Sequence, residues 1–117
     1  LTNIRFTYPT KKEIEVLSDV TIEVAKNKTI ALVGSSGCGK STVIQLVERF
    51  YDPLEGTATF GQQDLRQVDP VDYKSYLAIV QQEPVLFSDS IRDNIVYGAK
   101  WNVTDAELDN ACKSACD

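Results

Sequence analysis

One stretch of nine residues combines the residue types that bind phosphate. Residues 34–42 fit the pattern G-x-x-x-x-G-K-[ST] of a phosphate-binding loop. Glycines let the backbone adopt positive φ and bring several N–H groups close to the oxygens of one anion. Lys40 can place a positive charge on the β- and γ-phosphates of a nucleotide, and Ser41 can bind Mg²⁺ through its hydroxyl. The predicted binding residues are Gly34, Ser35, Ser36, Gly37, Cys38, Gly39, Lys40, Ser41 and Thr42.

The residues on either side of this loop predict the elements that would hold it. Residues 29–33 form an apolar run typical of a buried strand, and apolar side chains recur at helical spacing from Val43 to a helix end near Tyr51. A strand, a glycine-rich loop and a helix are the context in which this motif binds phosphate, because the helix directs free N–H groups and its positive dipole end at the same anion. The alternative is a glycine-rich turn without a ligand.

Alternating side chains predict further strands around this loop. Residues 4–8 and 20–24 alternate between apolar and polar side chains, as half-buried strands do, and Asn27 can adopt the left-handed conformation of a following turn. After the loop, short apolar runs predict strands at 57–60 and 77–80. The order predicts an α/β fold with antiparallel strands first and a parallel sheet around the phosphate loop.

Three more helices are predicted from their first residues. Asp69 and Pro70 fit the N-cap and the first helical position, and residues 90–96 fit one or two helical turns. Thr104 followed by Glu107 has the spacing of a capping box. No repeat or linker separates these elements, which indicates one domain.

Composition excludes several classes of protein. The 117 residues are 43% hydrophobic and 25% charged, which is the balance of a globular domain with one small core. The net charge of −5 argues against a nucleic-acid-binding surface, which would be basic. No apolar run reaches the ~18 residues of a membrane helix, and we expect no signal peptide. The chain contains no His, which excludes histidine-based catalysis, and no Met, so we expect it to be part of a longer polypeptide.

The three cysteines indicate a reducing compartment. Their number is odd, and their positions form no disulfide framework. Cys112 and Cys116 have i, i+4 spacing on a predicted helix, which a metal or redox pair could use. Ordinary helix packing is the reading that we favour, because neither a His nor a third nearby thiol completes such a site.

Several separated motifs resemble one known family. They occupy residues 6–9 (Phe-Thr-Tyr-Pro), 31–42, 48–53 (Glu-Arg-Phe-Tyr-Asp-Pro), 80–87 (Val-Gln-Gln-Glu-Pro-Val-Leu-Phe) and 90–95. In this order they resemble the nucleotide-binding domain of ATP-binding cassette (ABC) exporters, and most closely multidrug transporters of the P-glycoprotein type. The resemblance runs from end to end of the chain. It implies an ABC-type P-loop NTPase fold that binds ATP and Mg²⁺.

The same resemblance implies roles for individual residues. Tyr8 matches the aromatic residue that stacks on adenine in this family. Gln82 matches the Q-loop glutamine, which binds Mg²⁺ through its side-chain oxygen and senses the coupling helices of the membrane domain. Lys40 and Ser41 match the phosphate-binding lysine and the Mg²⁺-binding hydroxyl. The residues implied as backbone contacts to the nucleotide are Gly37, Gly39 and Thr42.

Several features of the family are missing from residues 1–117. The family's signature sequence, its Walker B strand with the catalytic glutamate, its D-loop and its switch histidine have no counterpart. We therefore expect the chain to be the N-terminal part of one nucleotide-binding domain, with no catalytic residue of its own and with Gln82 in support. Asn27, Phe60 and Tyr73-Lys74 also depart from the family's pattern, but at scaffold positions.

The resemblance also implies partners and a location. A second nucleotide-binding domain would sandwich ATP with this one, and a transmembrane domain would hold both at the cytoplasmic face of a membrane, by expectation the plasma membrane. Two alternatives remain open. The chain could belong to a soluble cassette ATPase of DNA repair or translation, or it could be a fragment that binds nothing.

Overall fold

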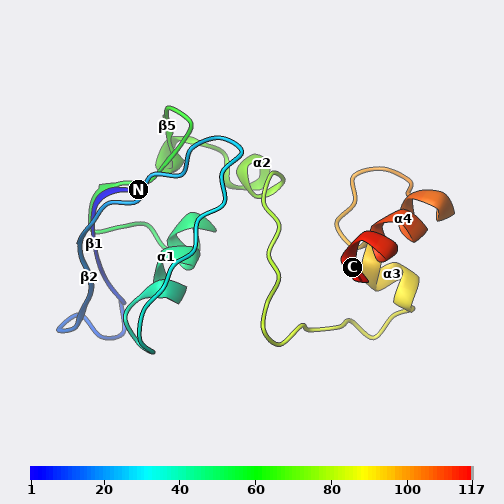
Figure 1. Cartoon of the computed structure of the whole chain (residues 1–117). Coiled ribbons are helices and arrows are strands. Elements are labelled where there is room, and N and C mark those ends of the chain that lie inside the picture. Colours follow the sequence, from blue (N-terminus) through cyan, green and yellow to red (C-terminus); the bar gives the residue numbers. More distant parts are fainter. Residues whose placement is uncertain (117) are drawn as a thin grey trace. The chain divides into compact units, whose positions relative to one another are not determined.

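The computed structural model describes residues 1–116 (Figure 1). Its first part contains a three-stranded antiparallel sheet. The strand order is β2 (Glu15–Val20), β1 (Thr2–Thr7), β3 (Glu55–Thr57). Ile4 and Phe6 of β1 are buried and lie opposite Val20 and Leu17 of β2. Because alternate residues of a strand share one face, the alternation at 4–8 correctly predicted β1 and its buried side.

Helix α1 (Lys40–Val47) packs against the buried side of this sheet. It contributes Val43 and Leu46, which are three residues apart and therefore lie on one helix face. Burying a side chain of this size contributes about 1.5–3 kcal/mol, so this contact fixes the helix to the sheet. The helix ends before the predicted position near Tyr51, because Arg49 adopts a positive φ of 56°.

A smaller core follows in the same part of the chain. It is built from the hairpin of β4 (Thr59–Phe60) and β5 (Gln63–Asp64), the 3₁₀ turn Leu65–Gln67 and helix α2 (Pro70–Lys74). Ala58, Leu65 and Tyr73 form its buried centre. The predicted strand at 57–60 is thus divided between β3 and β4. Asp69 caps α2 as predicted, because its carboxylate accepts hydrogen bonds from the first turn.

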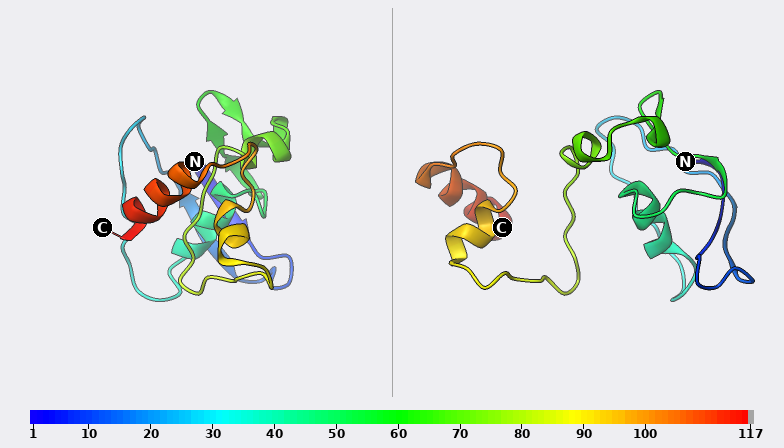
Figure 2. Two further views of the ribbon diagram at one scale, coloured as in Figure 1. Left: turned by 90° about the vertical axis from the view of Figure 1, so that its right-hand side faces the viewer. Right: turned by 180° about the vertical axis from the view of Figure 1, so that it is seen from behind.

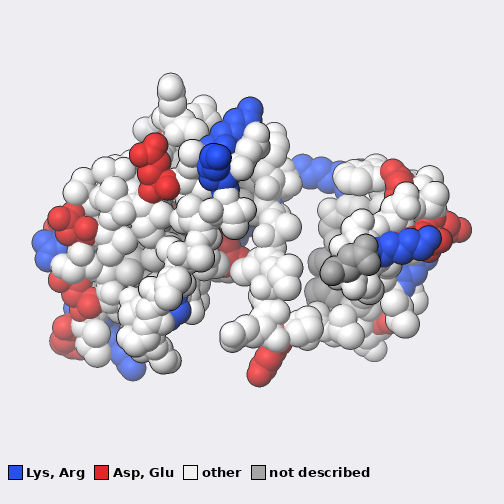
Figure 3. Space-filling model, in the orientation of Figure 1, with Lys and Arg blue, Asp and Glu red and all other residues white. Residues whose placement is uncertain are grey.

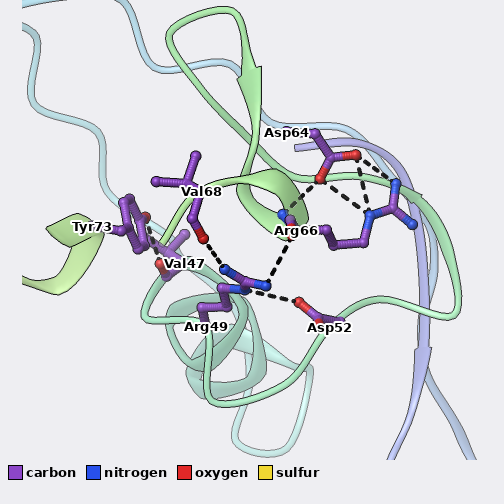
Figure 4. A network of polar contacts seen from close by, with 7 residues as sticks. All are labelled: Val47, Arg49, Asp52, Asp64, Arg66, Val68 and Tyr73. Carbon is purple, nitrogen blue, oxygen red and sulfur yellow. Dashed lines mark hydrogen bonds and ion pairs between the residues drawn. The ribbon is translucent and has the colours of Figure 1, made fainter. Parts of the chain in front are cut away.

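Arg49 joins the end of α1 to the segment before α2. Its guanidinium donates to the main-chain carbonyls of Val68 at 2.7 Å and Arg66 at 3.4 Å, and it pairs with Asp52 at 3.4 Å (Figure 4). Only 15% of the Arg49 side chain is exposed. Partly buried hydrogen bonds from a charged donor stabilise more than exposed ion pairs do, so Arg49 connects the two cores.

From Ile79 onward the described residues form a second compact unit, separate from Leu1–Ala78. Its helices are α3 (Ile91–Val96) and α4 (Asp105–Cys116). The predicted capping box is present: the Glu107 carboxylate accepts from the Thr104 N–H at 2.8 Å, and the Thr104 hydroxyl accepts from the Glu107 N–H at 3.3 Å. Arg92 of α3 pairs with Asp105 at 2.5 Å and so ties α3 to the start of α4.

Asn94 determines the course of the chain that leads into α3. Its side-chain oxygen accepts from the Phe87 N–H at 2.7 Å. Its amide nitrogen donates to the carbonyls of Phe87 at 3.1 Å, Asp89 at 3.3 Å and Ser90 at 2.9 Å. One side chain therefore bonds four main-chain groups in a segment that has no strand or helix of its own.

Three predicted strands are absent from residues 1–116. The segments 20–24, 29–33 and 77–80 run as irregular chain, apart from Val20 at the end of β2 (Figure 2). A parallel strand needs hydrogen-bonding neighbours, and none lies beside 29–33 or 77–80 within the described chain. Val33 is 91% exposed and Val80 99% exposed, although both have the apolar character of a buried strand. The boundary between the two units also falls inside 77–80.

On the face drawn in Figure 3, Lys and Arg alternate with Asp and Glu within each unit and form no continuous basic surface. None of the helices in residues 1–116 is long and apolar enough to cross a bilayer.

Candidate nucleotide-binding site

The loop at residues 34–42 depends on glycine at specific positions. Gly37 and Gly39 have φ of 80° and 96°, values that side chains disfavour. A Cβ at Gly39 would also lie 2.8 Å from Leu17 Cδ2, and a Cβ at Gly34 would lie 2.6 Å from Cys38 Sγ. The positive φ angles and the close approaches together explain why the motif places glycine here.

Lys40 folds back over this loop. Its ammonium donates to the carbonyl oxygens of Gly34 at 2.8 Å and Ser35 at 2.7 Å, and it lies 3.5 Å from the Cys38 thiol. The positive charge is thereby held at the loop, where an anion bound by the loop's N–H groups would meet it. The geometry fits the role that the motif predicts for this lysine.

The first turn of α1 has unpaired donors. The N–H groups of Lys40, Ser41 and Thr42 come too early in the helix to have an intrahelical partner. Among the α-helices of residues 1–116, α1 alone has no side-chain cap at its N-terminus. The other three are capped by Asp69, Ser90 and Thr104. An uncapped helix start that follows a glycine-rich loop suits an anion.

A magnesium ion would find few protein ligands here. Ser41 is exposed on the first turn of α1, so its hydroxyl is accessible. Within the described chain no three His, Cys, Asp or Glu side chains form a cluster able to hold a metal, and this includes Cys112 and Cys116. Mg²⁺ commonly keeps several waters and binds through substrate phosphates with one or two protein oxygens. A single hydroxyl ligand, that of Ser41, therefore fits a Mg²⁺ ion that binds together with a nucleotide and takes its other ligands from phosphate and water.

Tyr8 lies beside the phosphate loop, and both its ring and its hydroxyl make contacts that hold the side chain in place. Its ring packs edge-on with Phe6 and Tyr51, at centroid distances of 5.1 and 5.4 Å. Its hydroxyl lies 2.9 Å from the Thr42 hydroxyl and donates to Gln45 Oε1 at 2.8 Å. The sequence did not identify Gln45, whose signal would have been its position three residues after Thr42 on the same helix face.

Gln82 belongs to the second unit. Its side chain is exposed in the irregular segment between Ile79 and α3. The structure thus brings Tyr8 and residues 34–42 together within the first unit, whereas Gln82 is positioned independently of them.

Comparison with known proteins assigns this geometry to a family. The model of the ABC transporter family matches residues 17–115. A bacterial Atm1-family ABC exporter, solved with ATP bound, is 41% identical and superposes with a TM-score of 0.90 over 98% of this chain and 20% of its own. The chain belongs to the ABC transporter family, and the predicted ABC-type P-loop NTPase fold is confirmed in its truncated form.

Multidrug exporters are among its relatives. The ABC multidrug transporter MDR1 of Cryptococcus neoformans var. grubii is 46% identical over 96% of this chain, and the multidrug resistance protein pgp-1 of Caenorhabditis elegans is 46% identical over 97%. The sophorolipid transporter of Starmerella bombicola is 48% identical over 91%. The chain spans about 8–9% of the length of these relatives. The resemblance to multidrug exporters is thus confirmed.

Proposed function

We propose that this chain binds ATP with Mg²⁺ as part of the ATPase motor of an ABC efflux transporter. The observation that carries the proposal is the phosphate loop, in which the Lys40 ammonium and the uncapped start of α1 adjoin the same glycine-rich turn. The relatives whose names include multidrug and sophorolipid transport support export as the process that ATP drives.

Each part of the nucleotide would meet a different group. The N–H groups of residues 34–42 and Lys40 would bind the phosphates, and Tyr8 would stack on adenine, a contact of about 1 kcal/mol. Ser41 and Gln82 would hold Mg²⁺, which neutralises charge on the β- and γ-phosphate oxygens.

Hydrolysis would need residues outside this chain. Phosphoryl transfer to water requires a group that orients the attacking water, and the described residues 1–116 show no carboxylate at the end of a buried strand to do so. We propose that the chain is the N-terminal part of one nucleotide-binding domain and that it does not hydrolyse ATP alone. A second nucleotide-binding domain and a transmembrane domain, at the cytoplasmic face of a plasma membrane, would complete the motor.

The test is ATP binding by the full-length protein, with the phosphate-binding lysine of the second nucleotide-binding domain replaced, and by the Lys40→Ala variant of that protein. Removing the ammonium should abolish most triphosphate affinity, because it deletes the charge on the β- and γ-phosphates. Lys100→Ala is the matched control, since Lys100 is an exposed lysine of the second unit, and it should bind ATP normally. Equal ATP binding by Lys40→Ala and by the protein that keeps Lys40 would contradict the assignment of residues 34–42 as the phosphate-binding loop.

Membrane fractionation separates the proposal from the other alternative. An exporter should remain with the membrane after alkaline carbonate extraction, whereas a soluble cassette ATPase of DNA repair or translation would be released. Recovery of an ATP-binding protein entirely in the soluble fraction would contradict the exporter proposal. It would not contradict the proposal that residues 34–42 bind the nucleotide.

A further inference from the structure

We propose that Gln45 is a positioning residue for nucleotide binding, acting through the ring of Tyr8. The inference rests on the proposed function, because it takes Tyr8 as the residue that meets the adenine base. Gln45 lies outside residues 34–42, and its side chain is directed at Tyr8 from the second turn of α1. Its role would be to hold the ring in the orientation that stacking needs.

The direction of the hydrogen bonds defines a chain of three side chains. A tyrosine hydroxyl has one proton, and that of Tyr8 is donated to Gln45 Oε1 at 2.8 Å. The contact of 2.9 Å between the hydroxyls of Tyr8 and Thr42 must then use the Thr42 proton. Thr42 is only 4% exposed, so water cannot readily replace this bond. The order of donation is therefore Thr42 to Tyr8 to Gln45.

The rest of the Tyr8 ring is held only by apolar contacts. Phe6 and Tyr51 pack against it at interplanar angles of 81° and 89°. Such edge-on contacts attract the ring but leave it room to tilt, whereas the two hydrogen bonds fix the position of the hydroxyl. Without the Gln45 acceptor, the partly buried hydroxyl would keep only its bond with Thr42, and the ring would be held less firmly in the orientation that stacking needs.

The same chain connects the base to the phosphates. Thr42 and Gln45 are three residues apart on one face of α1, and Thr42 belongs to the turn whose N–H groups are expected to face the phosphates. Gln45 therefore holds the ring from the same helix that presents the phosphate donors. We expect its loss to affect ligands that carry a base and to spare ligands that consist of phosphate alone.

The experiment compares ATP with tripolyphosphate, which has no base. The two ligands are compared by how well each displaces a fluorescent ATP analogue from the full-length transporter. The phosphate-binding lysine of the second nucleotide-binding domain is replaced, so that only the site of this chain is measured. Gln45→Leu should weaken ATP about fivefold, the equivalent of roughly 1 kcal/mol, and leave tripolyphosphate unchanged. Tyr8→Phe should do the same, and the double variant should lose no more than either single variant, because both changes break one chain.

Two further variants keep the result interpretable. Gln45→Glu retains an acceptor and should bind ATP more tightly than Gln45→Leu, while Gln67→Leu replaces an exposed glutamine of the 3₁₀ turn and should change nothing. Unchanged tripolyphosphate binding also shows that each variant is folded at the phosphate loop.

The outcomes separate this inference from the proposed function. Equal losses of ATP and tripolyphosphate in Gln45→Leu would mean that Gln45 only supports the fold of the loop, and the inference would be wrong. Full ATP affinity in Gln45→Leu, or additive losses in the double variant, would also overturn it. If Lys40→Ala binds ATP as the wild type does, the nucleotide site itself is misassigned.

Discussion

The hydroxyl of Tyr73 donates a hydrogen bond of 2.7 Å to the main-chain carbonyl of Val47 (Figure 4). Val47 is the last residue of α1, where carbonyls have no partner within the helix. Tyr73 is 3% exposed and comes from α2. The smaller core of Ala58, Leu65 and Tyr73 therefore supplies a hydrogen-bond donor to the C-terminal end of the helix that follows the phosphate loop. Substitutions that disrupt either core should therefore also destabilise α1.

Tyr73→Phe should lower the free energy of unfolding by about 0.5–1.5 kcal/mol, because it removes the hydrogen bond to the Val47 carbonyl. Burial also raises the pKa of Tyr73 above its ordinary value of 10.0. The unfolded chain then releases the phenolic proton at a lower pH than the folded chain does. This contribution to stability is complete below pH ~10 and is lost as pH rises through the folded pKa.

Thermal unfolding of both proteins between pH 8 and 11 measures the two effects. The wild type should lose stability above pH ~10 more steeply than Tyr73→Phe, which has no proton to release there. Parallel curves for the two proteins would show that the Tyr73 hydroxyl is not buried as described. Tyr76→Phe is the matched control, since Tyr76 is 69% exposed.

Alanine substitution at two glycines of the loop should give different results. Both positions have positive φ, but a Cβ at Gly37 meets nothing within 4 Å, whereas one at Gly39 lies 2.8 Å from Leu17 Cδ2 and 3.3 Å from the Val16 carbonyl oxygen. Gly37→Ala should cost about 1 kcal/mol of stability, and Gly39→Ala about 2–3 kcal/mol with loss of ATP binding. Thermal unfolding and ATP titration measure both, and an equal cost at the two positions would contradict the close approach.

Labelling of Cys38 should block nucleotide binding. The thiol is exposed and lies 3.5 Å from the Lys40 ammonium, inside the loop that would surround the phosphates. A maleimide adduct would fill that space, so we expect ATP affinity to fall below detection and Mg-ATP to protect the thiol from reaction. The rate of labelling with and without Mg-ATP measures this, with Cys38→Ala as the control for reaction at Cys112 and Cys116. Normal ATP binding by fully labelled protein would place the nucleotide elsewhere.

Acid should destabilise the start of α4 in a step that depends on Glu107. Hydrogen bonds from the N–H and hydroxyl of Thr104 hold the pKa of Glu107 below its ordinary value of 4.5. The stabilisation is present above pH ~4.5 and is lost as pH falls through the lowered pKa. Helicity followed by circular dichroism from pH 6 to 2 should show this step, and Glu107→Gln should flatten it. A step of the same size in the Gln variant would exclude Glu107 as its source.

Local signals predicted the helix starts and the loop well. Asp69, Thr104 and Asn27, which adopts φ of 60°, behave as their side-chain chemistry requires, because caps and turns depend on residues only a few positions away. The glycine-rich loop at 34–42 also depends on local residues, and its binding of phosphate stays a prediction. Its glycines and Lys40 act on their own neighbours.

Signals that depend on distant partners failed. The apolar pattern at 29–33 and 77–80 is that of central strands, but a strand forms only where neighbours bond to it, and none does so within residues 1–116. Gln45 was missed because its partner Tyr8 is 37 residues away in sequence. The positive φ of Arg49, which ends α1 early, has no signal in the residue type.

Asn94 places the shape of a whole loop under the control of a single position. Since four main-chain groups are bonded by this amide, the path from residue 87 to residue 90 does not depend on the side chains of residues 88 and 89. Residues 88 and 89 can therefore diverge between related proteins, or be altered by design, while the loop keeps its course. A shorter or charged side chain at position 94 would lose these bonds, and the loop would no longer keep its course when residues 88 and 89 change. No other side chain of the described loop bonds these main-chain groups.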